Sequence, residues 1–210
     1  MTTAETLEWP VEAMERLEAS HRKRGHATYW HADNNSQDPM EVGATLDWTE
    51  EMNERGWKID TIRKNSETYP DCIAEMDGEK IGVEVTELVD ENAIKRHPGN
   101  PRYEGPVQFM RKFPQPPPPE WPFEKFERHL QERVRHKDVR VKDGSLSKQF
   151  LLVVTDEPWL DEATLAEHLK TIKLQRPRHF DGVFVMTSYV PDPAGRGGGH
   201  YPIFEVPFLN

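Results

Sequence analysis

Two carboxylates, Asp71 and Glu84, are spaced so that a β-hairpin would bring them face to face. The turn between them is Asp77-Gly78, a strong hairpin signal because a type I′ turn needs positive φ at both central residues. Antiparallel pairing about this turn places Asp71 opposite Glu84. Directly opposed residues have Cβ atoms roughly 4.5–5.5 Å apart, and like charges there destabilise the strand pair. A divalent cation is the simplest compensation, so the hairpin is a candidate metal site.

The alternation of residues in the second hairpin strand supports this register. Ile81, Val83 and Val85 would share one face and belong to the core, whereas Glu84 and Thr86 would share the other. Two interpretations of the polar face stay open at this point. It is either a solvent-facing row, which many such strands carry, or the lining of a metal site.

Composition describes one domain with long polar appendages: 210 residues, 35% hydrophobic, 30% charged and a mean hydropathy of -0.82. No apolar run approaches the roughly 20 residues of a membrane-spanning helix, and the first residues lack the basic and apolar regions of a signal peptide. We therefore expect a cytoplasmic protein with no membrane partner. The single cysteine, Cys72, excludes an internal disulfide and a cysteine-based zinc cluster.

The charge is unevenly distributed along the chain. The formal net charge is -10, but residues 1–91 hold 22 Asp and Glu against 9 Lys and Arg, while residues 92–210 hold 15 against 18. The overall charge argues against a protein that coats nucleic acid. Two basic clusters could contact phosphate, or could be solvated helix ends whose cations offset the helix dipole: Arg133, Arg135, Lys137, Arg140 and Lys142 in one, and Lys170, Lys173, Arg176 and Arg178 in the other.

Helical and alternating patterns predict the elements that would position these residues. A helix of residues 39–56 should start with Asp38 as N-cap and Pro39 in its first turn, with Glu41 completing a capping box. Further helices are expected at 10–24, 122–137 and 161–173, and strands at 57–63, 71–76, 80–86, 149–155, 182–186 and 201–206.

The order of these elements predicts an α/β fold with one mixed β-sheet flanked by helices. We expect residues 1–37 to form an extra N-terminal helix and a polar loop, and residues 38–210 to form a single α/β domain. An irregular, proline-rich insertion would occupy residues 92–122 of that domain, because its run of prolines can only be extended.

Pro70 and Asp71 opening one strand, with Glu84 inside the next, resemble the PD-(D/E)xK nuclease superfamily over residues 39–155. The resemblance implies a restriction-endonuclease-like fold. It also implies that Asp71, Glu84 and the backbone carbonyl of Val85 bind magnesium or manganese. An acidic residue of the preceding helix often joins such sites, and Glu41 is the candidate, although helix capping explains it equally well.

The sequence departs from this pattern at the position of the motif lysine, two residues after the glutamate. Thr86 stands there and carries no charge. Lys137, near the end of the helix that follows the hairpin, could supply the cation from another element, or could be an ordinary surface lysine. Glu87 would point away from Glu84 in a regular strand.

Three functions are compatible with these patterns. The first is a metal-dependent nuclease that hydrolyses phosphodiester bonds, of DNA in preference to RNA, with Asp71, Glu84, Thr86, Lys137 and Glu41 as candidate catalytic residues. The second is a nuclease-like fold without catalysis, serving as a binding or regulatory module, for example in a defence or mobile-element system. The third is an interaction protein whose carboxylates are surface residues. The partner would be nucleic acid or another protein, and a homodimer is an open arrangement.

Overall fold

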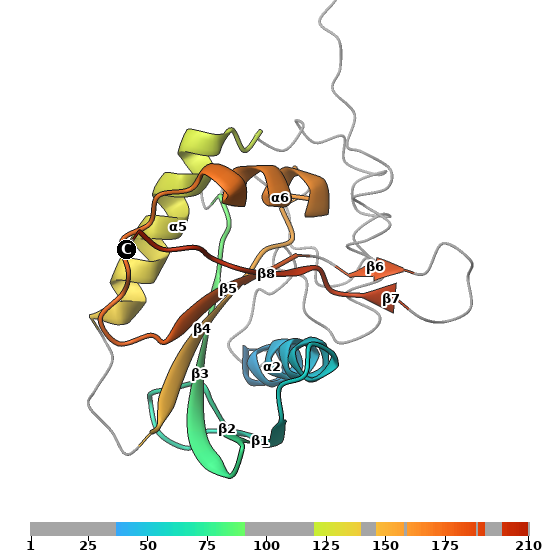
Figure 1. Cartoon of the computed structure of the whole chain (residues 1–210), viewed down its shortest axis with the longest axis vertical. Helices are drawn as coiled ribbons and strands as arrows, with labels where there is room; N and C mark the ends of the chain where they lie inside the picture. Colours follow the sequence, from blue (N-terminus) through green and yellow to red (C-terminus); the bar gives the residue numbers. More distant parts are fainter. Residues whose placement is uncertain are drawn as a thin grey trace, which may run out of the picture.

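The computed structural model describes residues 37–90, 120–139, 146–157, 159–187, 189–191 and 199–209. The helix expected at 10–24 and most of the proline-rich insertion lie outside the described residues. Every other element predicted from the sequence is present, with bounds that differ by a few residues. The described chain therefore has the α/β architecture expected of its pattern, organised on one mixed β-sheet (Figure 1).

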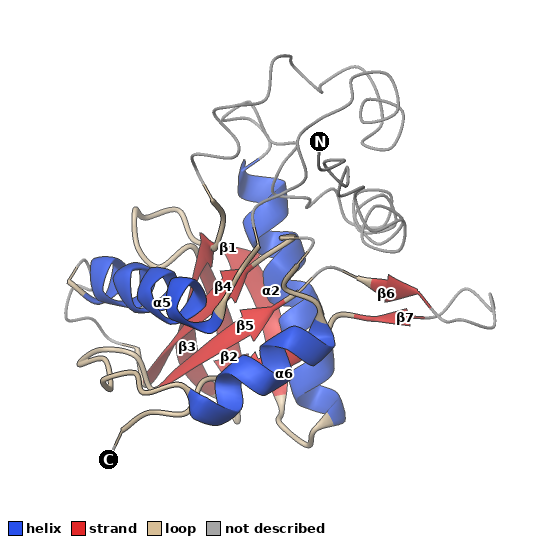
Figure 2. Cartoon of the chain, turned by 90° about the horizontal axis from the view of Figure 1, so that it is seen from above, coloured by secondary structure: helices blue, strands red, loops and turns tan. Residues whose placement is uncertain are grey.

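The sheet has six strands and mixed polarity. From edge to edge the strands are β1 (Ile59–Lys64), β2 (Cys72–Met76), β3 (Glu79–Glu87), β4 (Lys148–Val154), β5 (Gly182–Met186) and β8 (Ile203–Glu205). The first three are antiparallel neighbours, β3, β4 and β5 run parallel, and β8 returns antiparallel to β5. Two short strands that were not predicted, β6 (Val190–Pro191) and β7 (Gly199–His200), pair apart from this sheet (Figure 2).

The β2–β3 hairpin has the predicted register. Cys72 pairs with Val83 and Met76 with Glu79. The turn residues Asp77 and Gly78 have φ values of 52° and 84°, both positive as the Asp-Gly signal requires. The turn chemistry therefore sets the alignment of the whole hairpin.

Helices cover both faces of the sheet. Helix α2 (Gln37–Glu54) lies on one face, and α5 (Phe123–Asp138) and α6 (Glu162–Thr171) lie on the other (Figure 1). Helix α2 begins at Gln37, so the expectation that Asp38 is its N-cap is wrong. Asp161 does cap α6, because its side chain accepts a hydrogen bond from the backbone of Thr164.

The hydrophobic core is divided by the sheet into two clusters. On the α2 side, Trp48 is fully buried against Phe150 and Phe184, with ring centroids 5.4 and 5.5 Å apart. On the α5 and α6 side, Phe126 and Leu165 pack against the opposite face of the same strands. Such sandwiching explains why the central strands are apolar in almost every position.

The solvent-facing interpretation of the polar face of β3 is wrong. Its apolar residues Ile81, Val83 and Val85 do face the α2 core, as predicted. The opposite face, however, lies under α5, and Glu84 is only 5% exposed. A carboxylate buried this deeply needs a partner, which makes its surroundings the natural place to look for function.

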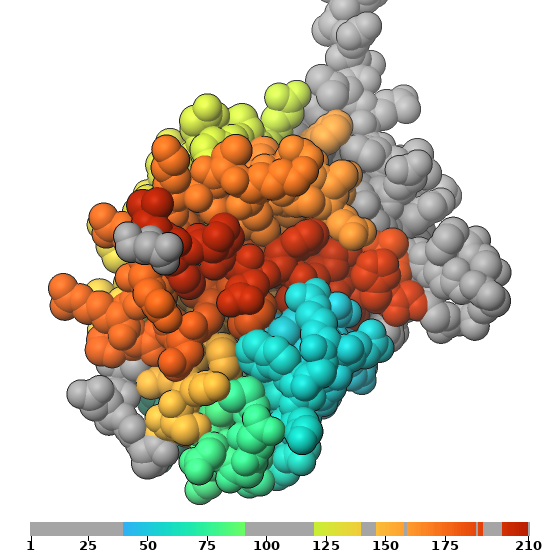
Figure 3. Space-filling view, in the orientation of Figure 1, coloured from blue at the N-terminus to red at the C-terminus, as the bar shows by residue number. Residues whose placement is uncertain are grey.

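The C-terminal segment finishes the domain between the helical layers. In the space-filling view its red surface lies between the surfaces of α6 and α2 (Figure 3). Val206 donates a backbone hydrogen bond to Val183, and Leu209 donates one to Leu174. Within the described ranges, no helix is both long and apolar enough to cross a membrane.

Candidate active site

Asp71 is positioned at the open end of the hairpin, one residue before β2 begins. Its Oδ2 accepts a hydrogen bond of 2.8 Å from the backbone N–H of Val85. Pro70 lies against Gly82, where an added Cβ would come within 2.8 Å of both the Pro70 ring and the Leu146 side chain. Only glycine leaves room for this approach, so Gly82 helps to hold Asp71 beside Glu84.

Glu84 is held by a lysine from a distant element. Lys137, in the last turn of α5, places its Nζ 2.5 Å from Glu84 Oε1 and 3.1 Å from the backbone carbonyl oxygen of Val85. The Lys137 side chain is 17% exposed and that of Glu84 6%. The interpretation of Lys137 as an ordinary surface lysine is therefore wrong.

The second oxygen of Glu84 is left without a partner. Oε2 is buried and has no hydrogen bond within the described part of the chain. Burial of an unsatisfied carboxylate oxygen is costly, which indicates a site that takes a further ligand. The same observation rules out Glu84 as a surface carboxylate, so the interaction protein with surface carboxylates loses its structural basis.

The charge of Glu84 affects the titration of Asp71. Burial, followed by the negative charge of Glu84, raises the pKa of Asp71 above its ordinary value. The Val85 N–H and the charges of Lys137 and Lys64 act in the opposite direction. The raised pKa of Asp71 is thus the result expected for an acid that is buried beside a second negative charge.

Tyr69 adds a neutral donor next to these acids. Burial and the negative charges of Glu84 and Asp71 raise the pKa of its phenol. Tyr69 therefore stays protonated, and its hydroxyl donates a 2.6 Å hydrogen bond to Gln149 Oε1 on β4. The sequence offered no pattern that pointed to this pair, although Tyr69 directly precedes the Pro-Asp motif.

Glu41 is connected to the site through Lys64. Its buried carboxylate forms an ion pair with Lys64 Nζ. The charge of Lys64 in turn opposes the rise in the pKa of Asp71 that burial and Glu84 cause. Lys64, another residue that sequence reasoning missed, links Glu41 electrostatically to the two central carboxylates.

The remaining two residues that the sequence singled out lie at the end of β3. Thr86 is half-buried and pairs with Val153 in the sheet, and its side chain forms no hydrogen bond with the other described residues. Glu87 keeps the regular strand alternation, and burial and the charge of Asp156 raise its pKa to about 7, while Arg133 acts in the opposite direction.

The oxygen atoms of the site fit a hard divalent cation. Within the described ranges, no group of three or more His, Cys, Asp or Glu side chains could hold a metal ion. Asp71 just before β2, and on β3 the Val85 carbonyl and the Glu84 oxygen that has no hydrogen bond among the described residues, nevertheless supply hard donors. Mg²⁺ commonly binds through one or two carboxylates and keeps several waters, so this partial set suits it or Mn²⁺.

We compared the chain with protein-family models, with curated proteins and with solved structures, and none of them matched. A function for this protein must therefore be inferred from the geometry of its site.

The packing around Gly82 predicts a defect when a methyl group is added there. Gly82→Ala should destabilise the protein by about 1–3 kcal/mol, because the neighbours must shift to relieve an overpacked contact. It should also reduce any Mg²⁺-dependent rise in melting temperature, since Pro70 leads directly into Asp71. Urea denaturation and thermal melts would measure both effects. The matched control is Glu79→Ala, an exposed position of the same strand; unchanged stability and metal response in Gly82→Ala would contradict the role of the glycine.

The raised pKa of Glu87 predicts a specific pH dependence. Its folded pKa of about 7 lies above the ordinary value of 4.5, so its contribution to stability is complete below pH 4.5 and is lost as the pH rises through 7. Glu87→Gln should therefore gain stability relative to the parent between pH values of about 5 and 9, by at most about 3 kcal/mol. Urea denaturation of both proteins in EDTA would test this. A difference independent of pH would contradict it.

Proposed function

We propose that this protein is a metal-dependent nuclease that hydrolyses phosphodiester bonds, of DNA in preference to RNA. The observation that carries the proposal is the position of Lys137 Nζ, which contacts both Glu84 and the Val85 carbonyl beside Asp71. A basic group, two carboxylates and a backbone carbonyl are thereby gathered around β3. These are the parts that hydrolysis of a phosphodiester requires.

The arrangement supports membership of the PD-(D/E)xK superfamily with a relocated lysine. A helix, an antiparallel β1–β2–β3 unit and a parallel β4 follow one another as that fold expects. Thr86 occupies the usual lysine position, but Lys137 brings an ammonium group to the same carboxylate from α5. The charge missing from β3 is thus supplied across the sheet–helix interface.

A magnesium or manganese ion would be held by Asp71, Glu84 and the carbonyl of Val85. When bound, such an ion lowers the pKa of a water ligand and neutralises charge on the phosphate. The feature of this chain that supports a bound ion is the buried Glu84 oxygen, which has no hydrogen bond with the described residues.

Lys137 has donor capacity left for substrate. An ammonium group has three N–H donors, and two are directed to Glu84 and Val85. The third can donate to an attacking water or to a phosphate oxygen. In this position Lys137 orients the nucleophile and stabilises negative charge as it develops, without leaving its carboxylate.

Tyr69 and Glu41 act through neighbouring residues and not on the reacting atoms directly. The protonated Tyr69 hydroxyl is fixed by Gln149 and fills space next to the acids with a neutral group, which keeps further negative charge out. Glu41 orients Lys64, whose charge reaches Asp71. Both are positioning residues in this proposal.

A binding or regulatory module without catalysis is the second candidate. One observation favours it: the Lys137 ammonium already neutralises Glu84, so the buried acid is compensated without any metal. In that case the pair would serve mainly to attach α5 to the sheet. The two candidates differ in whether the site binds an external cation in addition to Lys137.

Cleavage assays separate these functions. Plasmid, linear duplex and single-stranded DNA, with RNA for comparison, would be incubated with the protein in Mg²⁺ or Mn²⁺. We expect cleavage that falls at least about 10²-fold in Asp71→Asn, Glu84→Gln and Lys137→Met, the loss typical of removing one electrostatic stabiliser. Lys173→Met, which neutralises an exposed lysine outside the site, should cleave normally. Absence of cleavage under all conditions, with folded protein, would favour the binding module.

The contacts of Lys137 also predict a metal response that does not depend on cleavage. Without metal, Lys137→Met should lose about 3 kcal/mol of stability, because a buried carboxylate loses its counter-charge. Saturating Mg²⁺ should raise its melting temperature more than it raises that of the parent, since the ammonium no longer competes for the same oxygens. Lys173→Met should respond like the parent. An equal or smaller response in Lys137→Met, or none in any protein, would contradict a metal site at Glu84.

A further inference from the structure

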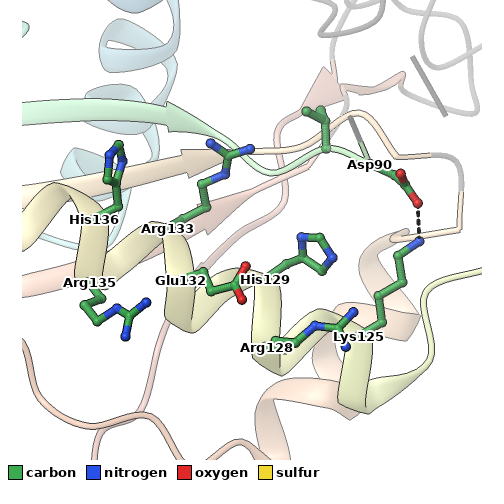
Figure 4. Close-up of a pocket in the computed structure, with 9 residues that line it drawn as sticks. Asp90, Lys125, Arg128, His129, Glu132, Arg133, Arg135 and His136 are labelled. Atoms are coloured by element: carbon green, nitrogen blue, oxygen red, sulfur yellow. Dashed lines mark hydrogen bonds and ion pairs between the residues drawn. The ribbon is translucent and has the colours of Figure 1, made fainter. Parts of the chain in front are cut away.

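A groove runs along α5 beside the candidate active site. It has a volume of about 530 Å³ and lies between the helix and the residues Val89 and Asp90 that follow β3 (Figure 4). Its helical wall carries six basic side chains: Lys125, Arg128, His129, Arg133, Arg135 and His136.

The groove is positively charged within an acidic protein. Four Lys and Arg side chains line it against two carboxylates, Asp90 and Glu132, whereas the whole chain has a net charge of -10. Asp90 is itself neutralised, because Lys125 Nζ lies 2.8 Å from its Oδ2. Burial, followed by the charge of Arg128, lowers the pKa of His129, while Glu132 acts in the opposite direction. A cationic surface of this kind attracts a polyanion locally while the rest of the protein repels it.

A row of side chains on α5 connects the groove with the candidate active site. Lys125, His129, Arg133 and Lys137 recur every four residues, so they follow one face of α5 at steps of about 6 Å. One end of this row meets Asp90 beyond β3, and the other end meets Glu84 within β3. Helix α5 therefore runs antiparallel to β3. The row of basic residues ends at Glu84, in the candidate active site.

We propose that this groove binds the phosphates of one single strand of nucleic acid and guides that strand to Asp71 and Glu84. The inference rests on the proposed function, because the strand is useful only if its end is processed or held there. A groove of this volume is within the range of sites that enclose small ligands, which corresponds to a short piece of one strand. A volume of about 530 Å³ cannot enclose a turn of duplex, whereas a single backbone can follow a charged groove.

The test measures binding rather than cleavage. Fluorescence anisotropy would follow a labelled single-stranded oligonucleotide of about 12 nucleotides in EDTA, where no hydrolysis takes place. The variant Arg128→Glu/Arg135→Glu reverses two exposed groove cations that touch neither Glu84 nor Asp90 in any described contact. If each arginine contacts one phosphate, affinity should fall at least about 25-fold at 0.1 M salt, and the slope of log K against log salt should become shallower by about 1.4.

The matched control is Lys58→Glu/Lys80→Glu, which makes the same change of net charge at exposed positions outside the groove and outside both basic clusters of the sequence. It should bind the oligonucleotide within about twofold of the parent. The milder Arg128→Gln/Arg135→Gln should show the same direction of effect as the reversal, which guards against a folding defect. Circular dichroism would check the fold of each variant.

Each outcome decides the inference separately from the nuclease proposal. Equal losses in the groove and control variants would mean that only net charge matters, and would overturn the groove. A duplex of the same sequence that loses as much affinity as the single strand would overturn the assignment to one strand. If the groove variants fail to bind while the parent binds but never cleaves, the groove stands and the nuclease proposal falls. If the parent cleaves and the groove variants bind normally, the reverse holds.

Discussion

The ion pair between Lys137 and Glu84 is the interaction on which the organisation of this protein depends. Glu84 sits in the middle of a strand that is covered on both faces, where an unpaired carboxylate would be strongly destabilising. The ammonium that compensates it comes from the last turn of a helix 53 residues further along the chain. Because the same ammonium contacts the Val85 carbonyl, the pair aligns α5 with β3 and sets the position of the helix over this face. Stability and the proposed chemistry therefore share one contact.

This contact also explains how the buried carboxylate of Glu84 is tolerated in the fold. The charges form a sequence from α2 across the sheet to α5, in which Glu41 is paired with Lys64 and Glu84 with Lys137, while Asp71 lies within reach of both lysines. Asp71 accepts a backbone hydrogen bond from Val85, but burial and the negative charge of Glu84 outweigh it and raise the pKa of Asp71. The site thus has one negative charge more than its lysines neutralise, which is the imbalance that a divalent cation would correct.

Local signals were sufficient for the hairpin but not for the site. The Asp77-Gly78 turn requires positive φ, and that requirement alone fixed the register and placed Asp71 at the level of Glu84. The burial of the polar face of β3 could not be predicted in the same way, because strand alternation does not show whether a helix covers a face. The partnership of Lys137 with Glu84 was open for a related reason. Spacing along α5 orders its side chains around the helix, but only tertiary packing decides which of them reaches β3. Tyr69, Lys64 and Gln149 escaped notice because single polar residues carry no periodicity.

The distribution of charge gives the fold a consistent physical interpretation. An acidic protein admits a polyanion only along a path where positive potential is concentrated, since exposed charges more than about 10 Å apart are screened from one another at ordinary salt. Helix α5 provides such a path because its basic residues share one face with the groove, while its carboxylates are few there. The helix is anchored to the strand at both ends of this face by Asp90 and Glu84, so its cations are held in place rather than left to sample many rotamers. Asp90 and Glu84 thereby fix the lysines at the two ends of the row, and the exposed Arg128 and Arg135 between them supply positive charge at the groove.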